Sequence, residues 1–230
     1  MKVKEVKKFF KGDHLSKPLI KYIYHPIAVY LSWIYINLKI SAHIVNLLGL
    51  AASLIAAALV FYGNRMSLVF AGILILFAYV SDLCDGTVAR AYNKKNAMGK
   101  WLDESAGLIG VSLVFFAFMM RTFMEKGNII IIYLGFITIF GYMMMNFAAI
   151  LSELIRAKFN LENPAEKARK KLSKKLFGIN PSLLSFSFDI QWTLVALGVA
   201  LDIPIVLFIV FGALSNLQWI ARYAIYWKNK

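Results

Sequence analysis

The amino-acid sequence predicts an all-α integral membrane protein with six transmembrane helices and an N-terminal amphipathic helix that lies in the membrane interface. Two observations carry this prediction. Of the 230 residues, 60% are apolar and 17% are charged, whereas soluble domains have roughly 45–50% apolar and about 25% charged residues. The apolar residues also gather in segments of about 20 residues, the length that crosses a bilayer core of roughly 30 Å. The composition therefore excludes a soluble globular protein.

The predicted spans are helices, because a lipid-exposed backbone can satisfy its hydrogen bonds only within a helix or a closed barrel. In chain order they are 41–62, 66–81, 106–120, 129–151, 183–201 and 203–226. The second and third are short as apolar runs, but each continues as a helix into the polar stretch 82–103 if that stretch lines a cavity. We therefore expect one six-helix membrane domain, residues 41–230.

Residues 1–40 are expected to form a separate cytoplasmic or interfacial segment. They mix aromatic and apolar side chains with lysines, a pattern typical of a helix that lies in the interface plane. The alternative is a short seventh span that starts near Pro26. The beginning of the chain is not a signal peptide, since no uninterrupted apolar stretch follows its positive residues.

The distribution of basic residues predicts the orientation. Of the 26 Lys and Arg residues, all but Arg65, Arg121 and Lys126 fall in the N-terminal segment, alternate connections and the C-terminal end. By the positive-inside rule, both termini and the 82–103 stretch face the cytoplasm. The net charge of +14 does not indicate a nucleic-acid partner, because the basic residues alternate with membrane-length apolar segments and form no continuous basic face.

The 82–103 stretch carries the residues with the clearest chemistry. Asp82 and Asp85 are three residues apart and share a helix face, and a turn through 93–96 brings Asp103 back on an antiparallel neighbour. Three converging carboxylates repel each other unless a cation joins them. Hard oxygen ligands suit Mg²⁺ or Mn²⁺, with Ca²⁺ a further candidate. The alternative is an ion-pair network with nearby basic side chains.

Two glycines and an arginine fit the same interpretation. Gly86 and Gly99 lie inside predicted helices, where glycine costs about 1 kcal/mol relative to alanine. Close approach of a ligand to the backbone would explain them. Arg90 follows Asp82 by about two helical turns and could clamp a phosphate with two hydrogen bonds.

The spacing Asp-x2-Asp-Gly-x2-Ala-Arg-x8-Gly-x3-Asp resembles the signature of the CDP-alcohol phosphotransferases, and its residues here are Asp82, Asp85, Gly86, Ala89, Arg90, Gly99 and Asp103. The resemblance implies a homodimeric membrane enzyme of lipid biosynthesis. It would displace CMP from a CDP-linked donor, such as CDP-diacylglycerol, with a polar acceptor. It also implies that the aspartates hold divalent metal and that Gly86, Ala89, Arg90 and Gly99 bind the nucleotide.

The chain departs from the signature at its last aspartate, which falls on Gly107. In the family this carboxylate is a metal ligand and the proposed base that deprotonates the acceptor hydroxyl. Glu104, three residues earlier, could reach the same place and act as the base. Alternatively the acceptor carries an ionised phosphate or phosphonate oxygen that needs no base, or the protein binds CDP and metal with weakened catalysis. Glu153 is a candidate base from elsewhere in the chain.

Three polar residues at helix ends are further candidates. His43 and Asn46 begin the first span, where they could line the nucleotide pocket or form hydrogen bonds between helices. Asp189 is unusual at its depth in the fifth segment, and we expect it to face a polar cavity near the cytoplasmic side.

Candidate ligands for the acceptor are basic. Arg156 and Lys158 end the fourth span, where related enzymes place basic residues for an acceptor's phosphate. Arg222 lies near the end of the last helix and is a third candidate. Positive-inside anchoring and snorkelling to the interface explain the same residues without a ligand.

Overall fold

A computed structural model describes residues 1–10, 17–93, 97–160 and 186–228. Within these ranges the chain is helical and contains no strand, so the predicted all-α class is confirmed. The elements are α1 (Val3–Val6), η1 (Lys7–Phe9), η3 (Ile20–Tyr24), α2 (His25–Asn37), α3 (Ala42–Tyr62), α4 (Arg65–Ala91), α5 (Ala97–Lys126), α6 (Ile129–Phe159), α8 (Phe188–Ala200) and α9 (Pro204–Lys228).

Among the described residues, five helices are long and apolar enough to cross a membrane: α3, α4, α5, α6 and α9. The fifth predicted span, 183–201, is not confirmed. Its place is taken by α8, an apolar helix of 13 residues, and residues 183–185 lie outside the described ranges. As predicted, the second and third spans continue beyond their apolar runs, so Asp82 lies within α4 and Asp103 within α5.

Polar side chains define where several helices begin. Ser41, Asn64 and Asn128 each accept a hydrogen bond from a backbone N–H in the first turn of α3, α4 and α6, which satisfies a donor that the helix itself leaves unpaired. The turn between α5 and α6 passes through Gly127 at φ +64°, a left-handed conformation that glycine adopts without steric cost. The short turns make neighbouring helices antiparallel.

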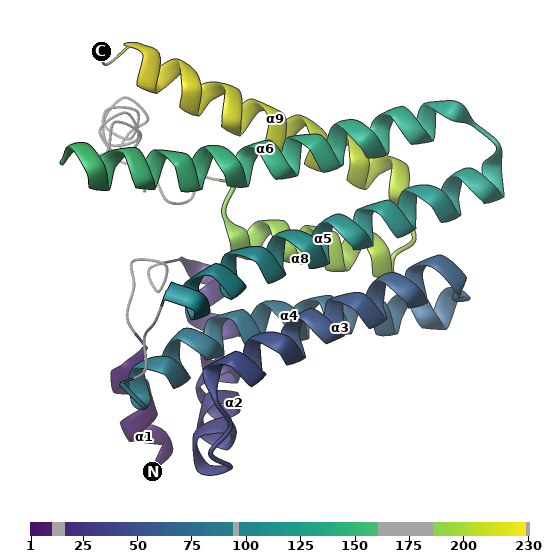
Figure 1. The fold of residues 1–230 in the computed structure, drawn as a ribbon. Helices are drawn as coiled ribbons and strands as arrows, with labels where there is room; N and C mark the ends of the chain where they lie inside the picture. Colours follow the sequence, from purple (N-terminus) through teal and green to yellow (C-terminus); the bar gives the residue numbers. More distant parts are fainter. Residues whose placement is uncertain (11–16, 94–96, 161–185, 229–230) are drawn as a thin grey trace.

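The long helices form one bundle, in which α3 packs against α4 and α5, α6 packs along α9, and α8 packs against α4 (Figure 1). Small residues permit the close approach that is usual between membrane helices. A Cβ on Gly110 of α5 would lie 2.7 Å from Cβ of Ser53 in α3, and one on Gly72 of α4 would lie 2.8 Å from the carbonyl oxygen of Ala196 in α8. The backbones of α3, α4, α5 and α8 are therefore held close together.

The predicted amphipathic character of the N-terminal helix is not confirmed. One face of α2 is buried, including Val29 and Tyr35, and packs on α4. The other face exposes apolar residues as well, among them Ile27 at 52% and Tyr30 at 61%. The helix is apolar on both faces because its sequence from Pro26 onward contains almost no charge, and its 13 residues are too few to span a bilayer core of roughly 30 Å.

One end of the bundle gathers the features that the sequence predicts to be cytoplasmic. The N-terminal elements α1 and α2, the last turn of α4, the first turn of α5 and the end of α9 all lie at this end (Figure 1). The turns that join α3 to α4 and α5 to α6 lie at the opposite end. Both termini and the polar 82–103 stretch thus share one end of the molecule.

Candidate active site

The three aspartates of the 82–103 stretch lie together. Asp82 and Asp85 belong to α4 and Asp103 to α5, and all three line one cavity. Asp85 is 8% exposed, and Nδ2 of Asn46 on α3 donates to its Oδ2 at 2.9 Å. The convergence expected from the spacing is therefore present in the structure.

A cavity of about 1090 Å³ opens beside these aspartates. Its walls come from α2, α3, α4, α5 and the residues between α2 and α3. Every residue predicted to contact nucleotide lines this cavity: Asn46, Gly86, Ala89, Arg90 and Gly99. His43 also lines it, as do Asp85 and Asp103. The structure therefore brings the whole predicted nucleotide set to one surface.

Arg90 is held by neighbours other than the aspartates. Its Nε donates to the carbonyl oxygen of Phe9 at 2.6 Å, and its Nη2 donates to Oγ1 of Thr87 at 3.2 Å. A Cβ on Gly86 would lie 3.3 Å from Nη1 of Arg90. Glycine at this position thus leaves room for the guanidinium, a reason that the sequence alone does not reveal.

Among the described residues, no close ion pair joins the aspartates to Arg90 or Lys100, although Asp85 interacts electrostatically with Arg90 and Asp103 with Lys100. Arg90 binds a carbonyl and a hydroxyl, and Nζ of Lys100 lies 4.0 Å from a carboxylate oxygen of Glu153. The remaining basic residues proposed for such a network, 94 and 95, lie outside the described residues. The carboxyl groups face each other instead.

A metal ion would have to be held by these carboxyl groups. In the part of the chain that the structure describes, no group of three or more His, Cys, Asp or Glu side chains is arranged to hold an ion as it stands. The donor chemistry nevertheless fits a hard divalent cation, because carboxylate oxygens are the ligands that Mg²⁺ prefers. Carboxyl groups in direct contact also repel one another unless they share a proton or a cation.

Gly107 lies next to the aspartates and has open space around it. It lines a cavity of about 20 Å³ together with Asp82 and Trp192. An added Cβ would meet a single atom within 4 Å, Cζ2 of Trp192 at 3.9 Å. The hydroxyl of Tyr142 donates to the Gly107 carbonyl at 3.2 Å. A longer side chain at this position would therefore extend beside Asp82.

Glu104, the predicted substitute for the missing carboxylate, is exposed. It interacts electrostatically with Asp103, Lys100 and Glu153, but it does not line the three cavities described here. Its carboxylate thus interacts with the aspartates, Asp82 included, from outside these cavities.

The predicted acceptor residues lie away from these cavities. Arg156 and Lys158 occupy the last turn of α6, and Arg222 lies on α9, which packs along α6. Arg156 is half-buried, and its Nε has no hydrogen-bond partner among the described residues. Lys158 is exposed and lies over the ring of Phe159. The three residues therefore do not share a wall with the aspartates.

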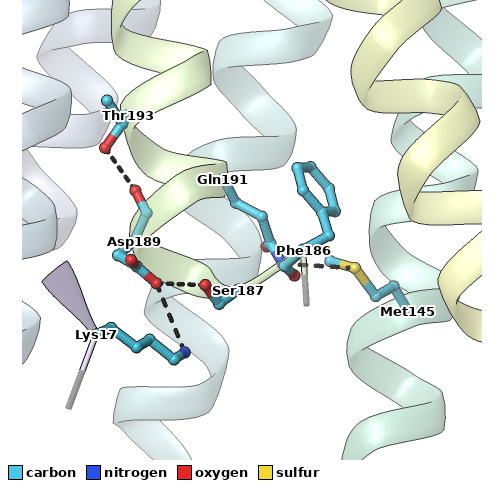
Figure 2. A network of polar contacts seen from close by, with 7 residues as sticks. All are labelled: Lys17, Met145, Phe186, Ser187, Asp189, Gln191 and Thr193. Carbon is cyan, nitrogen blue, oxygen red and sulfur yellow. Dashed lines mark hydrogen bonds and ion pairs between the residues drawn. The ribbon is translucent and has the colours of Figure 1, made fainter. Parts of the chain in front are cut away.

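A third cavity, of about 250 Å³, is lined by the three aspartates and by Lys17 and Asp189. The expectation that Asp189 faces a polar cavity is confirmed. Figure 2 shows Asp189 between Lys17 and Ser187, at the start of α8. Sequence reasoning missed Lys17, because nothing distinguishes it from the other basic residues of the N-terminal segment.

The geometry can be set beside known proteins. A model of the CDP-alcohol phosphatidyltransferase family matches residues 39–204, a range that includes the aspartates, Gly107 and Asp189. No curated protein sequence matches the chain. Because the family match spans most of the chain and contains the converging aspartates, the protein belongs to the CDP-alcohol phosphatidyltransferase family.

Proposed function

We propose that the protein transfers a phosphoalcohol or phosphatidyl group from a CDP-activated donor, such as CDP-diacylglycerol, to a polar acceptor and releases CMP. One observation carries this proposal: two of the converging aspartates, Asp85 and Asp103, and the residues predicted to bind nucleotide line a single cavity of about 1090 Å³. Membership of the family supports the same class of transfer. The cavity lies at the end of a membrane bundle, where a lipid-linked diphosphate could enter from the bilayer.

The residues around the large cavity suit the donor's nucleotide and diphosphate. Gly86, Ala89 and Gly99 present little side-chain bulk on its wall. Arg90 supplies a guanidinium that is already oriented by Phe9 and Thr87, and a preorganised guanidinium loses less entropy when it binds phosphate oxygens. Asn46 holds Asp85 in place from α3.

Asp82, Asp85 and Asp103 are the residues that would hold a divalent metal, Mg²⁺ or Mn²⁺. When bound, such a cation neutralises the charge of the diphosphate and of the departing CMP. The protein's own contribution is to bring three carboxylates from α4 and α5 to one wall, so that donor and acceptor meet in line.

The proposed reaction is a single displacement at the phosphorus that carries the donor's alcohol. The acceptor oxygen forms a new bond to this phosphorus, and the bond from phosphorus to the bridging oxygen breaks. CMP leaves with that bridging oxygen and the electron pair. If the acceptor is an alcohol, its proton passes to a base, for which Glu104 is the proposed residue and Glu153 the alternative.

A second candidate function is carried by Gly107. Without the signature's last carboxylate, the protein would bind CDP and metal on the same scaffold with weak turnover. An acceptor with an ionised phosphate or phosphonate oxygen would instead restore turnover without a base, and Arg156, Lys158 and Arg222 remain its predicted ligands. Release of CMP distinguishes these functions.

The proposal is tested with Asp85→Ala and CDP in detergent solution. In the wild type, CDP with Mg²⁺ or Mn²⁺ should raise the melting temperature, and in Asp85→Ala this stabilisation should disappear because a ligand and the partner of Asn46 are both lost. Asp202→Asn is the matched control, since it removes a carboxylate that pairs with Arg121. Equal stabilisation of Asp85→Ala and wild type would contradict the metal and donor assignments.

A further inference from the structure

The cavity of about 250 Å³ is not assigned to the donor in the proposal above. Its lining includes Asp82, Asp85, Asp103, Lys17 and Asp189. We call it the Lys17–Asp189 cavity. Its volume corresponds to roughly eight water molecules at ~30 Å³ each, so it suits a small molecule and excludes a nucleotide. It shares Asp85 and Asp103 with the donor cavity, and Asp82 lines it as well.

Its lining combines two polar groups with apolar side chains. One polar group is the aspartates with Arg90, on α4 and α5, and the other is Lys17 with Asp189, on the N-terminal segment and α8. The apolar part comprises Ile20, Tyr79, Leu83 and Phe188. A guest with two polar parts would match these two polar groups.

Lys17 and Asp189 form an ion pair on the wall of this cavity. Nζ of Lys17 lies 3.6 Å from Oδ1 of Asp189, and the two side chains are 21% and 3% exposed. The hydroxyl of Ser187 donates to the same oxygen (Figure 2). Removing two charges from water is costly unless they are well paired, so a pair kept on a cavity wall needs a reason beyond stability.

The surroundings hold this pair in place. Thr193 donates from its hydroxyl to the Asp189 carbonyl and shares a hydrogen bond with the hydroxyl of Tyr24. Tyr24 packs edge-on against Tyr79, which forms part of the apolar wall. The N-terminal segment and α8 are thus joined on both sides of the ion pair.

The charges on the walls select against a phosphorylated guest. Four carboxylates line the cavity, and its basic side chains are Lys17 and Arg90. Lys17 pairs with Asp189, and Arg90 donates to Phe9 and Thr87. A phosphate monoester would bring up to two negative charges to this surface, where Lys17 is paired with Asp189 and Arg90 is assigned to the donor's diphosphate. The Lys17–Asp189 pair instead offers a donor and an acceptor side by side.

We propose that the Lys17–Asp189 cavity binds the acceptor and that this acceptor is a small alcohol without net charge, either a polyol or a zwitterion. Its reacting hydroxyl lies at the aspartates, and its far hydroxyls, or its ammonium and carboxylate, bind Asp189 and Lys17. This inference rests on the proposed function and assigns the acceptor to a site different from Arg156, Lys158 and Arg222.

The test measures CMP release from CDP-diacylglycerol in detergent micelles with Mg²⁺. Glycerol, myo-inositol and serine are compared with glycerol 3-phosphate and inositol phosphate as acceptors. The wild type should release CMP with at least one of the acceptors without net charge. Lys17→Met and Asp189→Asn should each raise the KM for that acceptor tenfold or more, the scale of a lost hydrogen bond to a charged group. The KM for CDP-diacylglycerol should stay within about twofold.

Lys21→Met is the matched control, because Lys21 is an exposed lysine one turn further along the same segment. It should leave both KM values unchanged, and Lys17→Arg should restore most of the acceptor affinity. A purely structural role of Lys17 would lower the melting temperature or kcat without raising the acceptor KM. If Asp189→Asn does not fold, Lys17→Met is the deciding variant, because Lys17 is less buried than Asp189.

Two results would overturn the inference while the proposed function stands. One is turnover in which Lys17→Met leaves the acceptor KM unchanged, and the other is turnover with phosphorylated acceptors alone. Absence of CMP release with every acceptor would refute the proposed transfer, and the acceptor site with it. Stabilisation by CDP and Mg²⁺, measured on the same samples, shows whether donor binding survives in that case.

Discussion

An added side chain at Gly107 would meet only Cζ2 of Trp192 within 4 Å and would extend beside Asp82. We therefore expect Gly107→Asp to fold and to supply both a fourth carboxylate and a base. With alcohol acceptors it should raise CMP release by roughly 10²-fold, the usual scale for a general base. The measurement is the initial rate of CMP release at saturating CDP-diacylglycerol.

Gly107→Asn is the control for this prediction, since it has the same shape as Asp but cannot take a proton at neutral pH. A similar gain in both variants would argue against a base at this position. Glu104→Gln in the wild-type background shows whether Glu104 already serves as the base, because its loss should then lower the rate by roughly 10²-fold. An unchanged rate would indicate an acceptor that arrives ionised or another base.

At this scale the sequence predicts the acidic part of the site well and the rest poorly. Asp82, Asp85 and Asp103 could be placed together because a spacing of three keeps two of them on one helix face and a short turn returns the third. Lys17 could not be linked to Asp189, since their pairing depends on how distant helices pack. The role of Gly86 beside Arg90 likewise appears only when the guanidinium is placed.

Among the elements, the N-terminal segment has the most direct connection to the predicted donor site. The carbonyl oxygen of Phe9 accepts a hydrogen bond from Nε of Arg90. Met1 is bound to α2 by two hydrogen bonds: its amino group donates to Oδ1 of Asn37, and the indole N–H of Trp33 donates to its carbonyl oxygen. A segment that could be taken for a membrane anchor thus supplies a hydrogen bond to a signature residue.

Deletion of residues 2–10 should therefore weaken CDP binding. Arg90 would lose the acceptor for Nε and adopt several orientations, and loss of a hydrogen bond to a charged group corresponds to about tenfold or more in affinity. The Kd for CDP with Mg²⁺, measured in detergent by calorimetry, is the readout. Trp33→Phe is the control, because it removes a hydrogen bond to Met1 but keeps the Phe9 carbonyl. Equal Kd values for the deletion variant and the wild type would disprove that Phe9 orients Arg90 for CDP.

The helices themselves were predictable to the extent that apolar runs define them. The spans α3, α4, α5, α6 and α9 coincide with five predicted segments. The character of α2 was not predictable, because its lysine-rich neighbours suggested a polar face that the helix itself does not carry. Among the described residues, α8 is shorter than the predicted span 183–201, because the helix begins only after Ser187.

For the whole molecule, the testable property is sidedness. The 30 residues of α5 extend about 45 Å at 1.5 Å per residue, with Lys100 near one end and Lys126 at the other. We expect Lys100→Cys to be labelled by an impermeant thiol reagent only from the cytoplasmic side and Lys126→Cys only from outside. Cys84 is buried, and Cys84→Ser provides a cysteine-free background.

The physical reason for this expectation is the distribution of basic residues along the sequence, since positive charge is retained in the cytoplasm and the connection that holds Lys100 is one of the basic ones. Labelling of Lys100→Cys from outside would invert the orientation. Labelling of both positions from one side would mean that α5 does not cross the membrane. Neither result depends on catalytic activity, so the orientation is tested separately from the function.

The shortness of α8 has a consequence for the bilayer. Its 13 residues extend about 20 Å, and its last turn lies beside the ion pair between Arg121 and Asp202 at the far end of the bundle. With a hydrocarbon thickness of roughly 30 Å, its first residue stops about 10 Å short of the membrane interface at the end that holds the aspartates. Such a hydrophobic mismatch is relieved by local thinning of the membrane. Headgroups around α8 would then lie deeper than elsewhere, at the level of Asp189, so a lipid donor and a water-soluble acceptor could meet at the same depth.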